Sequence, residues 1–417
     1  MKKRYVMDLF AGCGGLSLGL ELAGFHPVFV NEINTNALES YLVNRGAVEP
    51  RLRDTQFHCN NVKELVTHDR IEKLKKSLLS AHGISIDSGD LDLLVGGPPC
   101  QGFSGIGHRR SYSVDKKQLP SNHLYQDMAW IIDAMQPKIF LFENVKGLMS
   151  SRWTPDGEKG EIWRDVQRTF KEIKGYKVES ALVYAKDYGV PQNRPRIILV
   201  GVRDDINLAS WDTLSSVANG FLPSPEYNYP DLSDVLGDLV DEEFVYGGST
   251  ISYPKRAITD IQKWFRKSPE NNQILKKGQL LTEHEYSKHN NRVTAKFKYM
   301  LENNGSISEE FKTKKFAQRL LPQKWGESGP NITATSLPDD YVHFSQARIL
   351  TVREWARLQG FPDWYQFSGS RTTGGIRRAG NPRAGIHERE LPKYTQIGNA
   401  VPVWLAREIG LHFKKVI

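Results

Sequence analysis

The sequence predicts an α/β fold, in which an open, largely parallel sheet carries helices on both faces and a second, less regular domain follows. Two observations lead to this prediction. Short apolar runs alternate with segments of helical spacing over about the first 200 residues, and this alternation stops after Asp204. Such alternation is typical of parallel sheets that are covered on both sides.

The chain opens with signals for a strand, a turn and a helix. Residues 4–10 (RYVMDLF) indicate the strand, the stretch AGCGG indicates the turn, and LSLGLELAGF has helical spacing. PVFVNEIN then predicts a second strand that ends in polar residues. Together these segments form a β-turn-α-β unit of about 30 residues, the usual opening of a nucleotide-binding sheet.

Further strands and helices continue this pattern. Near the other end of the chain, Thr351 and Glu354 form a capping box for a helix at 351–359, and Pro402 begins a last helix with apolar residues at every fourth position. The intervening region predicts only short, irregular segments. The remaining strands are expected at 91–97, 138–145, 176–185 and 196–203, and the remaining helices at 62–82 and 123–135.

Composition changes sharply after Asp204. Residues 205–250 contain nine acidic residues and no Lys or Arg, whereas residues 251–330 contain sixteen Lys and Arg against eight Asp and Glu. A regional basic excess in a chain of net charge +8 is compatible with an anionic partner such as nucleic acid, although a solvated surface also explains any single cluster. We place a domain boundary at this change.

The composition also argues against several protein classes. Hydrophobic residues make up 39% of the 417 residues, and no uninterrupted apolar stretch approaches the length of a membrane span. The three cysteines, Cys13, Cys59 and Cys100, are too few for a disulfide framework and too far apart for paired metal ligands. We therefore expect a cytoplasmic protein without a bound metal.

The first motif with chemical content is FAGCGG at 10–15. Its glycines allow the backbone to turn sharply and approach a ligand, and the following helix directs its positive end into the same space. Glu32 ends the second strand about twenty residues later, where a carboxylate can bind ribose hydroxyls. Neither phosphate-binding pattern, GxGxxG or GxxxxGK[ST], is present, so a nucleoside without phosphates fits better. S-adenosylmethionine is such a ligand.

The second motif is VGGPPCQGFS at 95–104. Gly96 and Gly97 follow an apolar strand, and they would lie at the carboxyl end of the sheet, where open α/β folds bind ligands. Pro98 and Pro99 restrict the backbone directly before Cys100. A rigid loop of this kind favours a thiolate nucleophile over a cysteine that packs in a core.

In these motifs and their order, the chain resembles the DNA cytosine-5 methyltransferases. The matching segments are DLFAGCGGLSLGLELAGF, GGPPCQGFS, ENV, QNRPR, RILTVREWARLQGFP and QIGNAVP. The resemblance implies a Rossmann-like S-adenosylmethionine-dependent methyltransferase sheet with a smaller, irregular target-recognition domain. By this interpretation, residues 1–204 form the catalytic and cofactor-binding domain, residues 392–417 complete it, and residues 205–391, which include the helix 351–359, form the recognition domain.

The resemblance also implies a reaction and its catalytic residues. The target cytosine is flipped out of the duplex, Cys100 adds to C6, and a methyl group passes from S-adenosyl-L-methionine to C5, leaving S-adenosyl-L-homocysteine. Glu143 acts at N3 of the base. Arg196 contacts O2, and Arg194 supports Glu143 or the cysteine loop.

Further residues are implied to bind the cofactor or the DNA. The family commonly has an acidic residue where this chain has Asn61, and an amide can still bond to the adenine edge. The implied cofactor contacts are Phe10, Ala11, Gly12, Gly14, Gly15, Leu16, Glu32, Ile33, Asn61, Val62, Pro98, Leu124, Asn399 and Ala400. The expected DNA contacts are Gln101, Ser104, Arg109 and Arg110, in or beside the loop 102–118, and Arg371 and Arg377 in a Gly/Arg-rich run.

Four functions remain to be compared, and one of them, a non-catalytic DNA-binding module, would have no reason to retain Cys100, Glu143 and Arg196 together. A tRNA cytosine-5 methyltransferase on the same catalytic frame is the main alternative, although the long variable region favours double-stranded DNA. A zinc-dependent cytosine deaminase needs a second cysteine that PPCQGF lacks. We therefore expect a monomeric, site-specific DNA methyltransferase, with a possible cognate restriction endonuclease as partner. Nothing in the variable region identifies the residues that read the DNA sequence.

Overall fold

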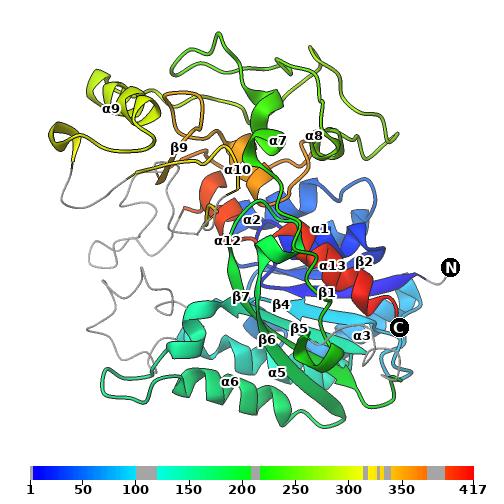
Figure 1. Cartoon of the computed structure of the whole chain (residues 1–417). Helices are drawn as coiled ribbons and strands as arrows, with labels where there is room; N and C mark the ends of the chain where they lie inside the picture. Colours follow the sequence, from blue (N-terminus) through cyan, green and yellow to red (C-terminus); the bar gives the residue numbers. More distant parts are fainter. Residues whose placement is uncertain are drawn as a thin grey trace, which may run out of the picture. The chain divides into compact units, whose positions relative to one another are not determined.

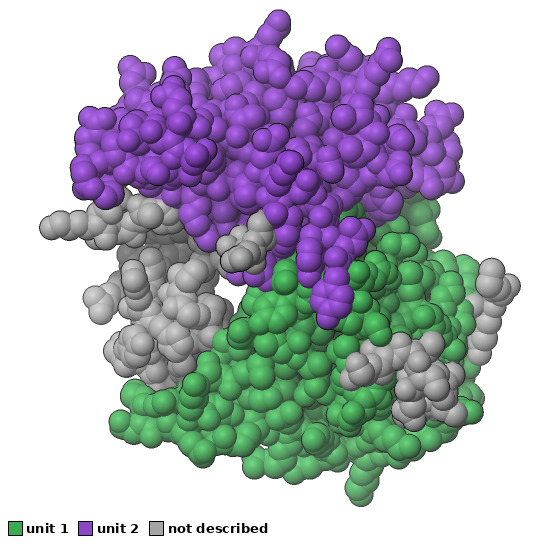
Figure 2. All heavy atoms as spheres, in the orientation of Figure 1, with its two compact units in different colours: residues 1–188, 195–226, 403–417 green, residues 189–194, 227–402 purple. Residues whose placement is uncertain are grey.

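The computed structural model of the chain describes residues 3–99, 120–207, 217–312, 318–325, 329–332, 340–372 and 390–417. Two compact units divide the chain, and Figure 2 shows them in different colours. Unit 1 consists of Met1–Tyr188, Pro195–Glu226 and Val403–Ile417. Unit 2 consists of Gly189–Arg194 and Tyr227–Pro402.

A seven-stranded sheet forms the centre of unit 1, in the order β3-β2-β1-β4-β5-β7-β6. The neighbours among β1 to β5 pair in parallel, whereas β7 runs antiparallel to both β5 and β6. The predicted, largely parallel sheet is thus confirmed. The strands are β1 (Arg4–Leu9), β2 (Phe25–Asn31), β3 (His58–Cys59), β4 (Leu93–Gly96), β5 (Ile139–Val145), β6 (Tyr176–Tyr184) and β7 (Pro195–Arg203).

Helices cover both faces of this sheet, with α1 and α13 on one face and α5 and α6 on the other (Figure 1). Helices α1 and α13 approach so closely that a Cβ atom added to Gly19 would lie 2.4 Å from the Cβ atom of Ala406. Only glycine permits this approach. The helices of unit 1 are α1 (Gly15–Leu22), α2 (Thr35–Val43), α3 (His68–His82), α5 (Leu124–Met135), α6 (Glu161–Lys171) and α13 (Val403–Phe413).

Unit 2 is built from short elements joined by long irregular segments. The predicted capping box is present: Thr351 Oγ1 accepts from Glu354 N (3.2 Å), and Thr351 N donates to Glu354 Oε2 (2.8 Å). Helices α7, α8, α9 and α12 were not predicted. The elements are α7 (Leu232–Leu236), α8 (Asp260–Phe265), α9 (Asn291–Glu302), α10 (Val352–Leu358), α12 (Lys393–Asn399), β8 (Arg319–Leu320) and β9 (Tyr341–Val342).

The boundaries of the compact units lie further along the chain than the predicted domain boundaries at 204 and 392. The chain passes from unit 1 to unit 2 after Glu226 and returns at Val403. In unit 1, His412 Nε2 lies 2.7 Å from the carbonyl oxygen of Gly220, and Glu226 N donates to Asp187 O. The segment before Tyr227 therefore joins unit 1 despite its acidic, proline-rich composition.

The described ranges lack two kinds of feature. No helix there is long and apolar enough to cross a membrane. The same residues contain no group of three or more His, Cys, Asp or Glu side chains arranged to hold a metal ion.

Candidate active site at the carboxyl ends of the strands

The glycine-rich turn after β1 has an unusual backbone. Phe10 (φ 57°), Gly12 (φ 57°) and Gly14 (φ 87°) all have left-handed conformations. The amide of Ala11 donates to the carbonyl oxygen of Asn31 at 2.9 Å, which ties the turn to the end of β2. A left-handed phenylalanine is costly, and such strain is concentrated at ligand-binding sites.

Glu32 joins this turn to the end of β2. Its Oε2 accepts from the amide of Gly12 and its Oε1 from the amide of Asn34, both at 2.8 Å. Burial raises the pKa of the Glu32 carboxyl group, while these hydrogen bonds oppose the rise. The adjacent Ile33 is 73% exposed. A carboxylate and an apolar side chain therefore stand together beside the glycine-rich turn.

These observations fit the predicted cofactor. A carboxylate beside the turn is placed to accept hydrogen bonds from ribose hydroxyls, and an exposed apolar side chain beside it offers a surface for a planar base. Left-handed residues that alternate with other conformations, as Phe10, Gly12 and Gly14 do, turn backbone N–H groups into a concave site for an anionic group such as a carboxylate. The backbone amides of residues 10–14, the Glu32 carboxylate and the apolar Ile33 side chain thus suit a nucleoside that carries an amino acid.

The other predicted cofactor residues are placed less uniformly. Asn61 is exposed, and its Oδ1 accepts from Lys63 N at 3.1 Å, whereas the Val62 side chain packs in the apolar core. Ala11 and Leu124 are partly buried, while Pro98, Gly15 and Leu16 are buried. In unit 2, Asn399 ends α12 with an exposed side chain, and Ala400 is buried. Cofactor contacts from all of these residues remain predictions.

A buried polar network supports the turn from below, and sequence reasoning missed it. Asp8 Oδ2 accepts from Ser17 Oγ at 2.5 Å, and Ser17 Oγ lies 2.8 Å from Tyr41 Oη. Burial raises the pKa of Asp8 to about 7. Asp8 Oδ1 is buried without a hydrogen-bond partner among the described residues. The signal in the sequence was a charged residue inside an apolar strand, which calls for a specific partner.

The ends of β4 and β5 meet at the predicted catalytic position. A Cβ atom added to Gly97 would lie 2.9 Å from Glu143 Oε2, and Asn144 Nδ2 donates to the carbonyl oxygen of Pro98 at 3.0 Å. The backbone that leads to the predicted nucleophile thus lies against Glu143. Cys100 itself lies outside the described residues, as do Gln101, Ser104, Arg109 and Arg110.

Glu143 forms a buried ion pair with Arg196 of β7. Arg196 Nε lies 2.5 Å from Glu143 Oε1, and the side chains are 8% and 11% exposed. The antiparallel register, which pairs Val145 with Arg196, brings the two residues together. Burial lowers the pKa of the Arg196 guanidinium, and the charge of Glu143 opposes this effect. The structure therefore joins two of the predicted catalytic residues.

Arg194 makes its contacts within unit 2. Its Nη2 donates to the carbonyl oxygens of Gly398 (2.6 Å) and Ala400 (3.1 Å), and its Nη1 donates to that of Ile332. Arg194 thereby holds the backbone on both sides of Asn399. Its predicted support of Glu143 or the cysteine loop remains a prediction.

The predicted DNA contacts are described only in part. Arg371 Nη1 donates to the carbonyl oxygen of Glu285 at 3.1 Å, and its Nε lies 3.8 Å from the Glu285 carboxylate. Its charge is therefore partly neutralised by a neighbour in unit 2. Arg377 lies outside the described residues.

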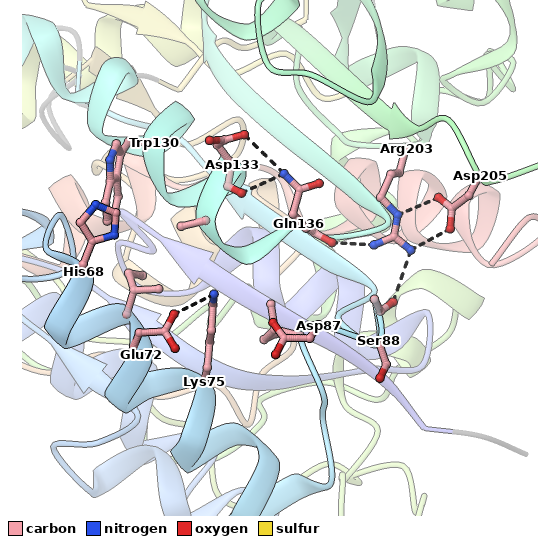
Figure 3. Close-up of a pocket in the computed structure, with 14 residues that line it drawn as sticks. His68, Glu72, Lys75, Asp87, Ser88, Trp130, Asp133, Gln136, Arg203 and Asp205 are labelled. Atoms are coloured by element: carbon pink, nitrogen blue, oxygen red, sulfur yellow. Dashed lines mark hydrogen bonds and ion pairs between the residues drawn. The ribbon is translucent and has the colours of Figure 1, made fainter.

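A cleft of about 680 Å³ opens elsewhere in unit 1, between residues of α3 and α5 (Figure 3). Its lining includes Asp87 and Ser88 before β4, Gln136 before β5, and Arg203, whose Nε donates to Asp205 Oδ1. These segments lie at the amino ends of β4 and β5, whereas Glu143 lies near the carboxyl end of β5. The cleft contains none of the predicted site residues.

The sequence matches the family model of the C-5 cytosine-specific DNA methylases over residues 5–415. The chain belongs to this family. Among curated proteins, the type II methyltransferase M.DdeI of Desulfomicrobium norvegicum is 30% identical over 420 residues, covering 97% of this chain and 87% of the relative. The type II methyltransferase M.PspPI of a Psychrobacter species is 32% identical over 421 residues, covering 97% and 77%.

Solved structures agree on the fold. A DNA modification methyltransferase encoded within an E. coli prophage superimposes with a TM-score of 0.66 at 23% identity, covering 99% of both chains. A mutant of Spodoptera frugiperda DNMT2 superimposes with a TM-score of 0.52 at 15% identity. At these identities, the likeness to solved structures shows the fold alone. The match to the family model shows the activity, which is methylation of DNA at C5 of cytosine.

Proposed function

We propose that this DNA cytosine-5 methyltransferase modifies one cytosine within a specific duplex sequence, as the modification enzyme of a restriction-modification system. The observation that carries the catalytic part is the buried pair of Glu143 and Arg196 against the backbone of Gly97 and Pro98. The relatives named as type II methyltransferases support the biological setting.

The proposed reaction begins with the nucleophile. The Cys100 thiolate forms a bond to C6 of the flipped cytosine. The electron pair of the C5–C6 double bond then forms a C4–C5 double bond, and the pair of the C4–N3 double bond moves to N3, which gives an enamine with a nucleophilic C5. C5 then takes a methyl group, a base removes the C5 proton, and the thiolate leaves C6. Covalent addition thus replaces one difficult step with several easier ones.

Glu143 and Arg196 would bind the base while the thiolate adds. Glu143 is proposed to protonate or hydrogen-bond N3, and Arg196 is proposed to donate to O2. Glu143 Oε1 lies 2.5 Å from Arg196 Nε, so the guanidinium holds the carboxylate at the end of β5.

The residues around the glycine-rich turn are proposed to hold S-adenosylmethionine. Glu32 would bind the ribose hydroxyls, Ile33 would contact the adenine, and the backbone of Phe10 to Gly14 would bind the amino-acid part. The bound cofactor supplies a methyl group on a sulfonium, which is electrophilic without a metal. The protein would hold the cofactor at the carboxyl ends of the parallel strands, the same end of the sheet at which Glu143 lies.

Methyl transfer to defined nucleic acids tests this proposal. The purified protein is incubated with labelled S-adenosylmethionine and either duplex DNA or tRNA, and bisulfite sequencing then locates the modified cytosines. We expect 5-methylcytosine at one recurring DNA sequence and none above background in tRNA. Modification of tRNA alone would favour the alternative substrate. Absence of label from both, with the protein folded, would contradict the proposal.

The nucleophile has its own test. Cys100→Ala should abolish methyl transfer while retaining DNA binding, because the base pocket remains. An oligonucleotide with 5-fluorocytosine at the target should crosslink to the wild-type protein, because fluorine at C5 cannot be removed as a proton. Cys59→Ala is a control for loss of a buried thiol. Full activity of the Cys100 variant would contradict the mechanism.

The proposed partners and location follow from this function. We propose a cytoplasmic monomer that acts on chromosomal DNA, together with an endonuclease that cleaves the same unmodified site. Light scattering of the purified protein should give the mass of one chain. Expression of the protein should protect cellular DNA from an endonuclease of matching specificity, and continued cleavage of fully modified DNA would argue against that pairing.

A further inference from the structure

A short antiparallel ribbon in unit 2 consists of residues 248–253 and 278–286. Bridges pair Ser249 with Glu285 and Ser252 with Leu280. Backbone hydrogen bonds of 2.8 and 2.9 Å join the two segments at both ends, from Tyr286 N to Gly248 O and from Tyr253 N to Gln279 O. The ribbon is thus a defined element although neither segment forms a long strand.

Buried side chains anchor this ribbon to the rest of unit 2. Tyr253, His284 and Tyr286 are 1 to 3% exposed. Tyr253 Oη donates to Asp363 Oδ2 at 2.7 Å. His284 Nε2 lies 3.0 Å from Leu239 O and its Nδ1 lies 2.8 Å from Thr351 Oγ1, so the ring links the ribbon to α10. The anchored ribbon cannot shift without breaking these contacts.

The second segment of the ribbon contains a bulge. Between the two bridges, the first segment has two residues and the second has four, which leaves two extra residues at Thr282 and Glu283. Glu283 has a left-handed backbone (φ 62°) and an ion pair with Lys393 at 2.7 Å. Arg353 of α10 donates to Thr282 O and Thr282 Oγ1. Bulges held in this way are common where a protein directs side chains at a ligand.

Two large aliphatic side chains of the ribbon face solvent. Ile251 is 71% exposed and Leu280 is 70% exposed. Ile251 lies opposite Leu281, whose N donates to Ile251 O at 2.9 Å, and Leu280 lies opposite Ser252, so the two aliphatic residues occupy neighbouring positions of the ribbon on alternate faces. An anchored element that presents aliphatic groups to water is typical of a surface that binds a partner.

The charges around these residues indicate the chemistry of that partner. Residues 251–280 contain seven Lys and Arg against two Asp and Glu. Arg256, Lys276 and Lys277 are exposed, and within the described ranges no ion pair neutralises them. Free cations beside aliphatic groups match duplex DNA, whose phosphates are anionic and whose base edges include apolar groups such as the thymine methyl.

We infer that this ribbon reads bases of the methylated site, with Ile251 and Leu280 in apolar contact with base edges and the nearby cations at phosphates. The inference rests on the proposed function, because it takes duplex DNA as the substrate. A two-stranded ribbon is narrow enough to enter the major groove. The anchoring by α10 keeps the two side chains in a fixed register, which discrimination between base pairs requires.

The test compares Ile251→Ala and Leu280→Ala with Val48→Ala, which removes a 73% exposed side chain in unit 1. After bisulfite sequencing has defined the wild-type site, kcat/KM is measured on that duplex and on duplexes with one base pair changed. Each ribbon variant should lose about 10-fold or more in kcat/KM on the intact site and discriminate less at one or two positions. Its Kd for a duplex without the site should stay within about twofold.

The controls separate the possible failures. Thermal unfolding must match wild type, and Ile251→Val should give an intermediate loss. Unchanged kcat/KM and discrimination in both alanine variants would overturn the inference and leave a protein partner as the occupant of this surface. A wild-type protein that methylates no DNA would instead defeat the proposed function.

Discussion

The two compact units use buried charge differently. In unit 1, the pair of Glu143 and Arg196 lies at the sheet edge beside the loop that carries the predicted nucleophile. In unit 2, Arg357 donates to Asp238 and Asp363, and all three side chains are at most 2% exposed. The first pair is proposed to contact substrate, whereas the second group connects secondary-structure elements within its own unit.

The difference follows from what else stabilises each unit. Unit 1 has a large apolar core on its sheet, which includes Phe29, Leu94, Ile132 and Phe140. Unit 2 is built from short elements, and one of its apolar clusters is formed around Leu239, Tyr253 and Leu281. A buried carboxylate without its cation costs several kcal/mol, so the ion-paired group in unit 2 also selects one arrangement of the segments that it joins. Charge thus serves chemistry in one unit and architecture in the other.

The largest effect should come from Glu143→Gln, which tests the first half of this comparison. The amide keeps the shape but cannot act as an acid, so kcat should fall about 100-fold to 10,000-fold. The melting temperature should also fall, because the amide leaves the buried Arg196 guanidinium without its anionic partner, so kcat is measured at a temperature at which the variant is folded. Glu172→Gln, at an exposed position after α6, is the matched control. Near-normal kcat in the Glu143 variant would remove this residue from the mechanism.

Arg357→Met tests the second half. The variant leaves Asp238 and Asp363 without their shared partner, and the free energy of unfolding should fall by about 3 to 5 kcal/mol. Arg53→Met breaks an exposed pair with Glu39 and should cost about 1 kcal/mol or less. Urea denaturation measures both. Equal losses in the two variants would show that burial does not distinguish these ion pairs.

The regular unit was the one that sequence could predict. Alternating apolar runs and helical spacings located six of its seven strands, because each such element buries a repeating pattern against one core. The missed strand, β3, has only the two residues His58 and Cys59. The strand end then predicted the site of Glu32, since ligands bind at the carboxyl ends of parallel strands, whereas Glu143 was implied by the resemblance to the DNA cytosine-5 methyltransferases.

The irregular unit resisted prediction for a physical reason. Arg353, Glu354 and Arg357 of α10 have the composition of a solvated helix face, yet all three are buried. Their partners, such as Asp238, Thr282 and Asp363, are distant in the chain or lie in segments without periodicity. A pattern within one helix cannot show such contacts. The boundary after Glu226 lies beyond the predicted one at 204 because the contacts that hold the intervening segment in unit 1, such as His412 Nε2 to Gly220 O, join residues that are distant in the chain.

A smaller loss of stability is expected from Gly19→Ala, which probes the helix packing of unit 1. The added methyl group would lie 2.4 Å from the carbonyl oxygen of Val403, so α1 and α13 must separate. We expect a loss of about 1 to 3 kcal/mol. Gly46→Ala is the control, since its nearest neighbour would lie at 3.7 Å. Urea denaturation that gave the same stability for both variants would contradict the close packing.

The smallest effect should be an opposite pH dependence in the two units. Asp8 in unit 1 has its pKa raised from 3.8 to about 7 by burial, so between these values the folded state holds a proton that the unfolded state has lost. Its contribution to stability therefore falls as the pH rises from about 4 to 7.

His284 and His343 in unit 2 behave in the opposite way. Burial lowers their pKa values from 6.5 to about 4 and about 3, so below pH 6.5 the unfolded state binds protons that the folded state excludes. Their contribution is therefore lost as the pH falls.

Hydrogen exchange of peptides from each unit at pH 5.5 and 6.5, corrected for intrinsic exchange rates, can separate the two opposite pH dependences. Each group contributes at most about 1.4 kcal/mol per pH unit. Asp8→Asn should remove the part of the pH dependence of unit 1 that Asp8 contributes, and it should leave the pH dependence of unit 2 unchanged. If both units instead lost protection equally at pH 5.5, the two units would unfold as one cooperative structure. Their different use of buried charge would then not give them different stabilities.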